Sequence, residues 1–270
     1  MNETLLTEIL TAYQDAAGPM LRRLTPQLLT LLSATFLVQS AWDLLFSAVD
    51  DRPLLPMVLR KILTYSLLFF LATNLADLLP AILETFTAMG QSIGGSGTLS
   101  PEAMFRHGLA LATVLYHGWG SEFSRMLPGI AAFPQVGFFL VAGAFSLVAL
   151  QMLRTMIEAA LSLSGLAVLL GFWGLRLTRG ISEGYVRYLL EVGGRLFALL
   201  LVVSIGDGFA ASWVQRLGAL EPFDPVAGFT VMLASVTFAL VAWMIPNRVG
   251  RVVSRSFSFN PPGHGMPRHA

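Results

Sequence analysis

The chain has 270 residues, of which 55% are hydrophobic and 12% charged, and its mean hydropathy is +0.69. These values exclude an ordinary soluble domain and indicate an integral membrane protein. The net charge of +1 gives no case for nucleic-acid binding, and the absence of cysteine excludes disulfides and thiolate metal sites. The first residues lack the positive region of a cleavable signal peptide, so we expect the N-terminus to be retained.

Residues 1–27 are predicted to contain an N-terminal amphipathic helix. Apolar residues recur at helical spacing over the first 17 positions, and acidic residues occupy the other faces. The pair Gly18-Pro19 and then Pro26 are expected to interrupt this helix. We expect it to lie on the bilayer or on a neighbouring span.

The next part of the chain is predicted to form a helical hairpin, residues 28–83. A hydrocarbon core of about 30 Å takes roughly 20 mainly apolar residues to cross. Residues 28–48 and 62–83 meet this requirement. A linker rich in glycine and serine then leads into an extramembrane segment, and the two together cover residues 84–135.

A C-terminal transmembrane bundle is predicted at 136–246, followed by a basic cytoplasmic tail at 247–270. The bundle contains spans at 196–215 and 228–246. It begins with an apolar block, 136–177, that is long enough for two spans, or for one span plus a re-entrant or interfacial helix. The fold class is therefore an all-α polytopic membrane protein.

Basic residues favour five crossings over six. They gather between the first two spans, between the apolar block and the next span, and in the tail. These groups are Arg52, Arg60 and Lys61; Arg176, Arg179, Arg187 and Arg195; and Arg248, Arg251, Arg255 and Arg268. The positive-inside rule places all three in the cytoplasm only if the block crosses an odd number of times. The N-terminus is then outside, the C-terminus is inside, and 159–174 is the re-entrant or interfacial helix.

Three polar residues interrupt the apolar block on one helical face: Gln151, Arg154 and Glu158. Their spacings of three and four bring them together on a helix, and Arg154 with Glu158 can form an ion pair four residues apart. With 136–157 as the crossing helix, this polar stripe lies at the cytoplasmic end. We expect it to contact another subunit or to line a wet passage.

Polar residues inside the predicted spans are expected to make contacts within the protein, because buried polar groups in lipid cost several kcal/mol unless they are partnered. These residues are Gln39, Asp43, Asn74, Asp77 and Asp207. The span boundaries place Gln39 and Asn74 at one depth, which predicts a hydrogen bond between antiparallel helices. The alternative is that each bonds its own helix or a partner subunit.

The three carboxylates of this set have different expected roles. Asp43 lies near Arg60 and Lys61, either of which could neutralise it by extending toward the same end of the span. Asp77 is predicted to meet lipid headgroups near the outer face. Asp207 lies between two glycines that let another helix approach, so it is predicted to make an interhelical contact.

No catalytic, cofactor-binding or metal-binding residue is predicted, and the chain is not expected to be an enzyme. His107 and His117 lie ten residues apart, which is not a zinc spacing, and no H-E-x-x-H motif occurs. No G-x-x-x-x-G-K motif is present either, which excludes a phosphate-binding loop of that type. Asp207 lacks the second catalytic motif that an intramembrane aspartyl protease requires.

Seven segments, in order from about residue 25 to 245, carry a resemblance to a known family. They are LTLLSATFLVQSAWDLLFSAVD, PLLPMVLRKILTYSLLFFLATN, GSGTLSPEAMFRHG, AAFPQV, ALQMLRTMIEAALS, VVSIGDGF and VMLASVTFALVA. In this order and spacing the chain resembles the TrbL family, polytopic inner-membrane components of conjugative type IV secretion systems. The closest correspondence is a glutamine followed seven residues later by a glutamate, here Gln151 and Glu158. Arg154 departs from the family pattern, which is apolar there.

The resemblance implies a structural or channel-associated subunit of the bacterial inner membrane. Such subunits are thought to form an oligomeric ring, to support the minor pilin at the base of the stalk, and to help pilin, protein or DNA pass. Partner ATPases would then supply energy, and nucleic acid would be present only as transferred substrate. The alternative is a proton-coupled secondary transporter that uses the intramembrane carboxylates, but no inverted repeat supports it. A monomeric channel would need a filter-like motif, which is absent.

Overall fold

All regular secondary structure that the structure describes is α-helical, as the sequence predicts. The computed structural model describes residues 5–50, 54–94, 100–126, 133–173, 178–218 and 224–256. Its helices are α1 (Leu5–Asp50), α2 (Leu54–Gly94), α3 (Pro101–Met126), α4 (Phe133–Phe172), α5 (Arg179–Gly218) and α6 (Pro225–Ser256). The predicted boundaries at 27, 83 and 246 fall inside α1, α2 and α6.

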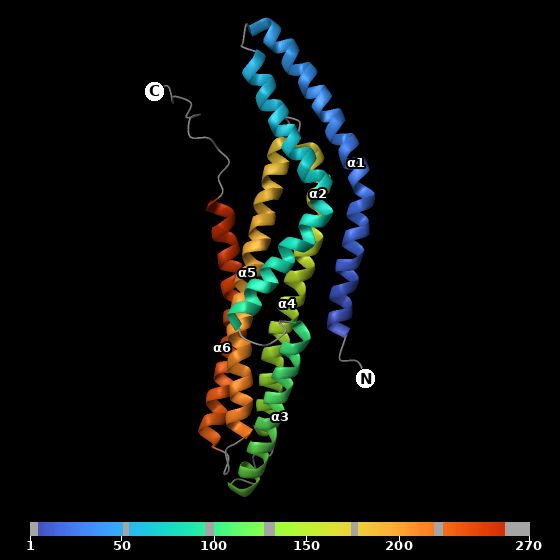
Figure 1. The fold of residues 1–270 in the computed structure, drawn as a ribbon. Helices are drawn as coiled ribbons and strands as arrows, with labels where there is room; N and C mark the ends of the chain where they lie inside the picture. Colours follow the sequence, from blue (N-terminus) through green and yellow to red (C-terminus); the bar gives the residue numbers. More distant parts are fainter. Residues whose placement is uncertain are drawn as a thin grey trace, which may run out of the picture.

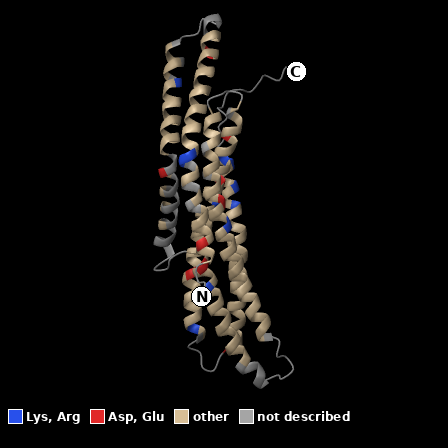
Figure 2. Ribbon diagram, turned by 90° about the vertical axis from the view of Figure 1, so that its right-hand side faces the viewer, with Lys and Arg blue, Asp and Glu red and all other residues tan. Residues whose placement is uncertain are grey.

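Four helices among the described residues are long and apolar enough to cross a membrane. They are α1 over Arg22–Phe46, α4 over Pro134–Phe172, α5 over Gly180–Leu217 and α6 over Pro225–Ser256. Charged residues are sparse along the ribbon and gather in a few bands (Figure 2). The chain is therefore a polytopic helical membrane protein. Since α2 is not one of the four, the count of five crossings stays a prediction.

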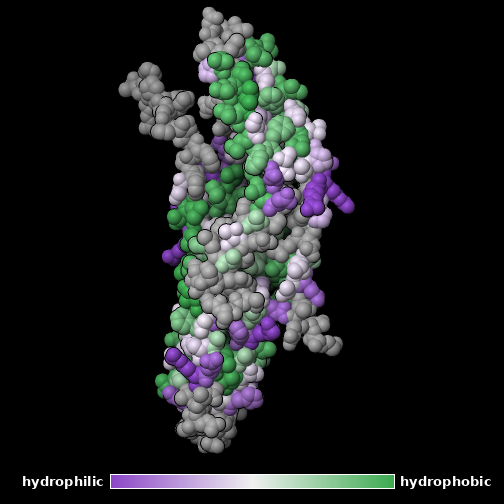
Figure 3. All heavy atoms as spheres, in the orientation of Figure 1, coloured by the Kyte–Doolittle hydropathy of each residue, from purple (hydrophilic) through white to green (hydrophobic). Residues whose placement is uncertain are grey.

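The helices run up and down a single elongated bundle, with the α1–α2 hairpin extending beyond its upper end (Figure 1). The chain rises through α1, descends through α2 and then α3, rises through α4, descends through α5 and rises through α6. The end of α1, the end of α4 and the end of α6 consequently point the same way. Hydrophobic residues cover much of the described surface of the projecting hairpin (Figure 3).

The expected interruption of the N-terminal amphipathic helix is wrong, because α1 continues through Pro19 and Pro26. A proline inside a helix removes one backbone hydrogen bond without forcing the helix to end. The start of α1 packs on the bundle: Leu10 is buried in the main core, and the Thr7 hydroxyl donates to Glu102 of α3 at 2.9 Å. These contacts hold the segment against α3 and give it a reason to remain helical.

The expectation of a separate re-entrant or interfacial helix at 159–174 is wrong, because most of this segment belongs to α4. Its 40 residues form one uninterrupted helix, which is about 60 Å long. Glycines in its second half serve close packing rather than a break. A Cβ at Gly171 would lie 2.5 Å from a methyl carbon of Leu31 on α1, and a Cβ at Gly165 would meet the Tyr185 hydroxyl of α5.

Two hydrophobic cores share α4. The larger core joins α3, α4, α5 and α6 around fully buried side chains such as Trp119, Phe145 and Leu199. The smaller core joins the α1–α2 hairpin to the other half of α4 through residues such as Leu32 and Leu170. Helix α3 begins at a serine cap, because Ser100 accepts a hydrogen bond from the Ala103 amide at 3.0 Å.

Alanine substitutions at two glycines, Gly193 on α5 and Gly250 on α6, are expected to change the stability in opposite directions. A Cβ at Gly250 would lie 2.8 Å from the carbonyl oxygen of Glu191, a backbone atom that cannot rotate away, whereas a Cβ at Gly193 would meet nothing within 4 Å. We expect Gly250→Ala to lower the free energy of unfolding by about 1–3 kcal/mol. Gly193→Ala should raise it by up to about 1 kcal/mol through better helix propensity. Unfolding by titration with sodium dodecyl sulfate measures both, and equal shifts of the same sign would contradict the packing described.

Candidate functional site

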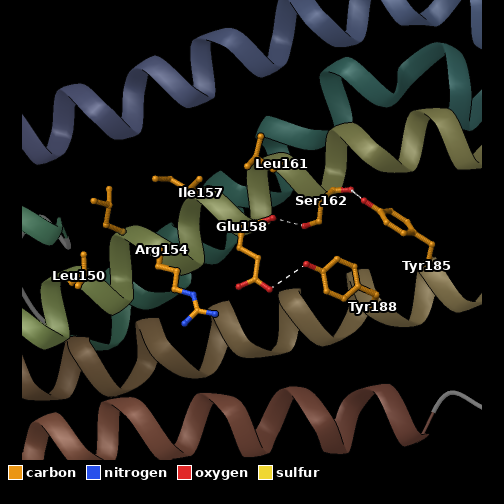
Figure 4. A pocket seen from close by; sticks show the side chains of 9 residues that line it. Leu150, Arg154, Ile157, Glu158, Leu161, Ser162, Tyr185 and Tyr188 are labelled. Atoms are coloured by element: carbon orange, nitrogen blue, oxygen red, sulfur yellow. Dashed lines mark hydrogen bonds between the residues drawn. The ribbon is translucent and has the colours of Figure 1, made fainter.

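The three residues of the predicted polar stripe lie on α4 in three different environments. Gln151 is buried, with 5% of its surface exposed, Glu158 is half-buried and Arg154 is exposed. Arg154 and Glu158 both extend from α4 toward α5 (Figure 4). The stripe is therefore a partly buried polar strip at the α4–α5 contact, with Arg154 at its open side.

Glu158 is held by α5 through an arginine and a tyrosine. Arg195 Nη1 donates to both Glu158 oxygens, at 3.0 and 3.1 Å, and its Nη2 donates to Glu191 Oε1 at 3.1 Å. The Tyr188 hydroxyl donates to Glu158 Oε1 at 3.2 Å (Figure 4). One guanidinium thus bridges two carboxylates, one from each helix, and we call these four residues the α4–α5 network.

The ion pair that helical spacing allows between Arg154 and Glu158 does not form. Arg154 forms no hydrogen bond or ion pair with any residue that the structure describes, whereas Arg195 is paired with Glu158 and only 15% of its side chain is exposed. An interaction shielded from water is stronger than an exposed pair on one helix face, which is screened by solvent. Glu158 therefore joins two helices instead of stabilising one.

An open pocket of about 660 Å³ lies beside this network. Arg154 and Glu158 line it together with Tyr185 and Tyr188 of α5, and the rest of the lining is leucine, isoleucine and one serine. The pocket combines an exposed cation with an otherwise largely apolar wall. Gln151 does not line it. Its Oε1 is buried and has no hydrogen-bond partner among the described residues.

A second network joins α1 to α2. Lys61 Nζ lies 2.7 Å from Asp43 Oδ2 and donates to the backbone carbonyl oxygen of Gln39 at 2.9 Å. The Gln39 amide donates to Asp43 Oδ1 at 3.0 Å. Asp43 is 5% exposed, so its charge is neutralised by Lys61 inside the hairpin. The side chain of Arg60, the other expected partner, lies outside the described residues.

The expected hydrogen bond between Gln39 and Asn74 is wrong, and the alternative of bonding within each helix holds. The Asn74 amide donates to the Phe70 carbonyl oxygen of α2 at 2.8 Å. The contacts of Asp43 with Lys61 and of Phe36 with Tyr65 show that α2 passes Gln39 well before Asn74. Asn74 lies about ten residues further along α2 than the residues opposite Gln39, which is a distance of roughly 15 Å. Helix α1 continues to Asp50 and α2 begins at Leu54, so the register differs from the one that spans at 28–48 and 62–83 implied.

The other two carboxylates in the predicted spans, Asp77 and Asp207, lie in different environments. Asp77 is exposed on α2, and its contact with headgroups stays a prediction. Asp207 of α5 contacts His107 of α3, with 2.6 Å between Oδ1 and Nδ1. Its neighbour Gly206 leaves room for Phe238 of α6. The residues around Asp207 therefore bring three helices together.

The pair formed by His107 and Asp207 is expected to contribute to the packing of α3 on α5. We predict a coupling free energy of about 0.6–2 kcal/mol between His107→Ala and Asp207→Ala, typical of polar pairs between membrane helices. A double-mutant cycle on the free energy of unfolding measures it. Additive effects of the two changes would show that the pair contributes no interaction energy.

The sequence pattern did not identify three residues of the α4–α5 network: Arg195, Glu191 and Tyr188. It places Arg195 only in a cytoplasmic basic group. A signal was nevertheless available, because Glu158 directly follows the predicted span 136–157 and Arg195 directly precedes the span 196–215. Antiparallel neighbouring spans bring such ends together.

The fold and its networks define a polytopic helical membrane protein whose ionisable groups join helices to one another. Within the described ranges, no group of three or more His, Cys, Asp or Glu side chains could hold a metal ion. A family profile described as "TrbL/VirB6 plasmid conjugal transfer protein" matches residues 34–245. The chain belongs to this family.

Two curated relatives agree with this membership. The chain is 26% identical over 221 residues to a "Probable conjugal transfer protein TrbL" of Sinorhizobium fredii (strain NBRC 101917 / NGR234), covering 80% of this chain and 54% of the relative. It is 26% identical over 212 residues to a "Conjugal transfer protein TrbL" of Rhizobium radiobacter, covering 77% of this chain and 51% of that protein. The chain thus spans about half the length of each of these relatives.

Proposed function

We propose that the chain is a structural, channel-associated subunit of the inner-membrane complex of a conjugative type IV secretion system. It assembles there as a homo-oligomer and supports pilus biogenesis or the transfer of DNA or protein. The observation that carries this proposal is the family match over residues 34–245. Its proposed partners are the minor pilin or stalk subunit, other inner-membrane components and the surrounding lipid. ATPases act on it indirectly, and nucleic acid is present only as cargo.

The pairing of the intramembrane carboxylates supports a structural role over the alternative of a proton-coupled transporter. Three of the four carboxylates in the predicted spans and polar stripe contact a basic side chain of another helix. These pairs are Asp43 with Lys61, Glu158 with Arg195, and Asp207 with His107. Each pair joins two helices, so the contact contributes to the arrangement of the bundle, which is what a structural subunit requires.

The proposed location is the bacterial inner membrane, with the N-terminus in the periplasm and the C-terminus in the cytoplasm. The end of α1, the end of α4 and the end of α6 point the same way (Figure 1), and these are the places near which basic residues gather. The positive-inside rule then favours that end as cytoplasmic. Because the chain has no cysteine, one cysteine introduced near each terminus can be probed with an impermeant maleimide. Labelling of intact cells at the C-terminal position would contradict this orientation.

A conjugation assay tests the proposed function. A donor strain that lacks the chain should lose transfer and pilus formation, and expression of the chain from a plasmid should restore both. Purified chain in proteoliposomes should not take up substrate in response to a pH gradient. Normal transfer without the chain would refute the proposal, and proton-coupled uptake would favour the transporter.

A further inference from the structure

A long apolar groove runs between α5 and α6. It extends from Phe197 to Trp213 on α5 and from Thr230 to Val249 on α6, and its volume is about 780 Å³. At 1.5 Å per residue these stretches are about 24 and 29 Å long, close to the thickness of a hydrocarbon core. Apart from two threonines its lining is apolar or glycine. We call it the α5–α6 groove.

One end of the groove continues into a row of arginines on the same face of α6. Val241 lines the groove, Arg248 follows it by seven residues, and Arg255 follows Arg248 by seven. Residues seven apart share a helix face, and Arg251, three after Arg248, lies beside them. All three arginines are exposed.

The charges of these arginines are not neutralised within the described residues. Arg251 Nε donates to the Asn247 carbonyl oxygen at 3.1 Å, and none of the three arginines forms an ion pair with a described carboxylate. Helices α5 and α6 close together at this level, where Gly250 packs against the Glu191 carbonyl oxygen. The apolar channel therefore ends where the exposed cations begin.

We propose that the α5–α6 groove binds the acyl chains of an anionic phospholipid whose phosphate lies on Arg248, Arg251 and Arg255. Apolar length and terminal positive charge match the two parts of such a lipid, and basic sites at the cytoplasmic side of membrane helices bind anionic headgroups. A second copy of the chain is the other candidate occupant of the groove, and the test below distinguishes it from a lipid.

Native mass spectrometry of the full-length chain in detergent tests the proposal, with phosphatidylglycerol and phosphatidylcholine added separately. We expect retention of phosphatidylglycerol in preference to phosphatidylcholine. The double change Arg248→Gln with Arg251→Gln should weaken the binding of phosphatidylglycerol by about fivefold for each arginine. Arg216→Gln at the other end of α5 is the matched control and should leave this binding unchanged. Ala234→Leu, which fills the groove, should weaken retention of both lipids, while Leu240→Phe outside the groove should leave it unchanged.

Equal retention of the two lipids by the unmodified chain, or retention of phosphatidylglycerol that survives the double arginine change, would overturn the proposal. Loss of a dimer or larger oligomer in Ala234→Leu, with lipid retention unaltered, would also overturn it and assign the groove to a second copy. The helix content measured by circular dichroism verifies that each variant is folded.

Discussion

Replacing Arg195 with alanine is expected to lower the free energy of unfolding by about 3 kcal/mol, because it leaves two partly buried carboxylates facing each other. Arg195 bonds Glu158 through two oxygens and Glu191 through a third, and 15–24% of these side chains is exposed. This partial exposure places the cost at the lower end of the range for buried pairs. Titration with sodium dodecyl sulfate, followed by circular dichroism, measures it.

Two further variants separate the role of the α4–α5 network from a general effect of losing positive charge. Arg154→Ala removes an exposed arginine that has no partner among the described residues, so the change should stay within about 0.5 kcal/mol. Arg195→Lys keeps the charge but loses the planar fork that reaches both carboxylates, and should give an intermediate loss. If Arg154→Ala were as costly as Arg195→Ala, the network could not be the source of the stability.

Replacing Lys61 with methionine is expected to destabilise the α1–α2 hairpin by about 3–5 kcal/mol. Asp43 is 5% exposed, and Lys61 lies 2.7 Å from it. Without this ammonium group the buried carboxylate loses the cation that lies against it, and removing one partner of a buried ion pair is the costly way to break it. The same titration with sodium dodecyl sulfate measures the loss, and Arg23→Met on the exposed face of α1 is the control.

A second change should rescue this variant. Asp43→Asn removes the charge that Lys61 neutralises and keeps an oxygen that can accept the hydrogen bond from the Gln39 amide. The double variant Lys61→Met with Asp43→Asn should therefore recover more than half of the stability that Lys61→Met loses. Double-variant stability no better than that of Lys61→Met would mean that the ammonium acts through a contact other than the carboxylate.

Sequence periodicity and charge predicted the helices well because they depend on local composition. The apolar stretches appear as helices, and Lys61 could be named as a partner for Asp43 because both lie near one end of adjacent helices. Predictions that needed the relative shift of two helices failed. Gln39 and Asn74 were paired from assumed span ends, but the actual contacts place Gln39 opposite the first turns of α2.

Predictions of helix breaks failed for a different physical reason. Breaks were expected at Pro19 and Pro26, and a separate helix was expected at 159–174, yet Pro19, Pro26, Gly165 and Gly171 all lie inside continuous helices. Glycines that permit close packing and prolines that cost one hydrogen bond cannot be told from breakers without knowing what packs beside them. Likewise Arg195 became a bridging residue only once α4 and α5 were seen to lie side by side.

The most direct test of the proposed scaffold function is native mass spectrometry of the extracted protein, with and without co-expressed secretion components. The account predicts a discrete, ring-sized oligomer that retains a periplasmic stalk protein when one is present. A stable monomer or simple dimer that recruits no other component would contradict it, and Asp43, Asp77, Glu158 and Asp207 would then be tested as a proton path.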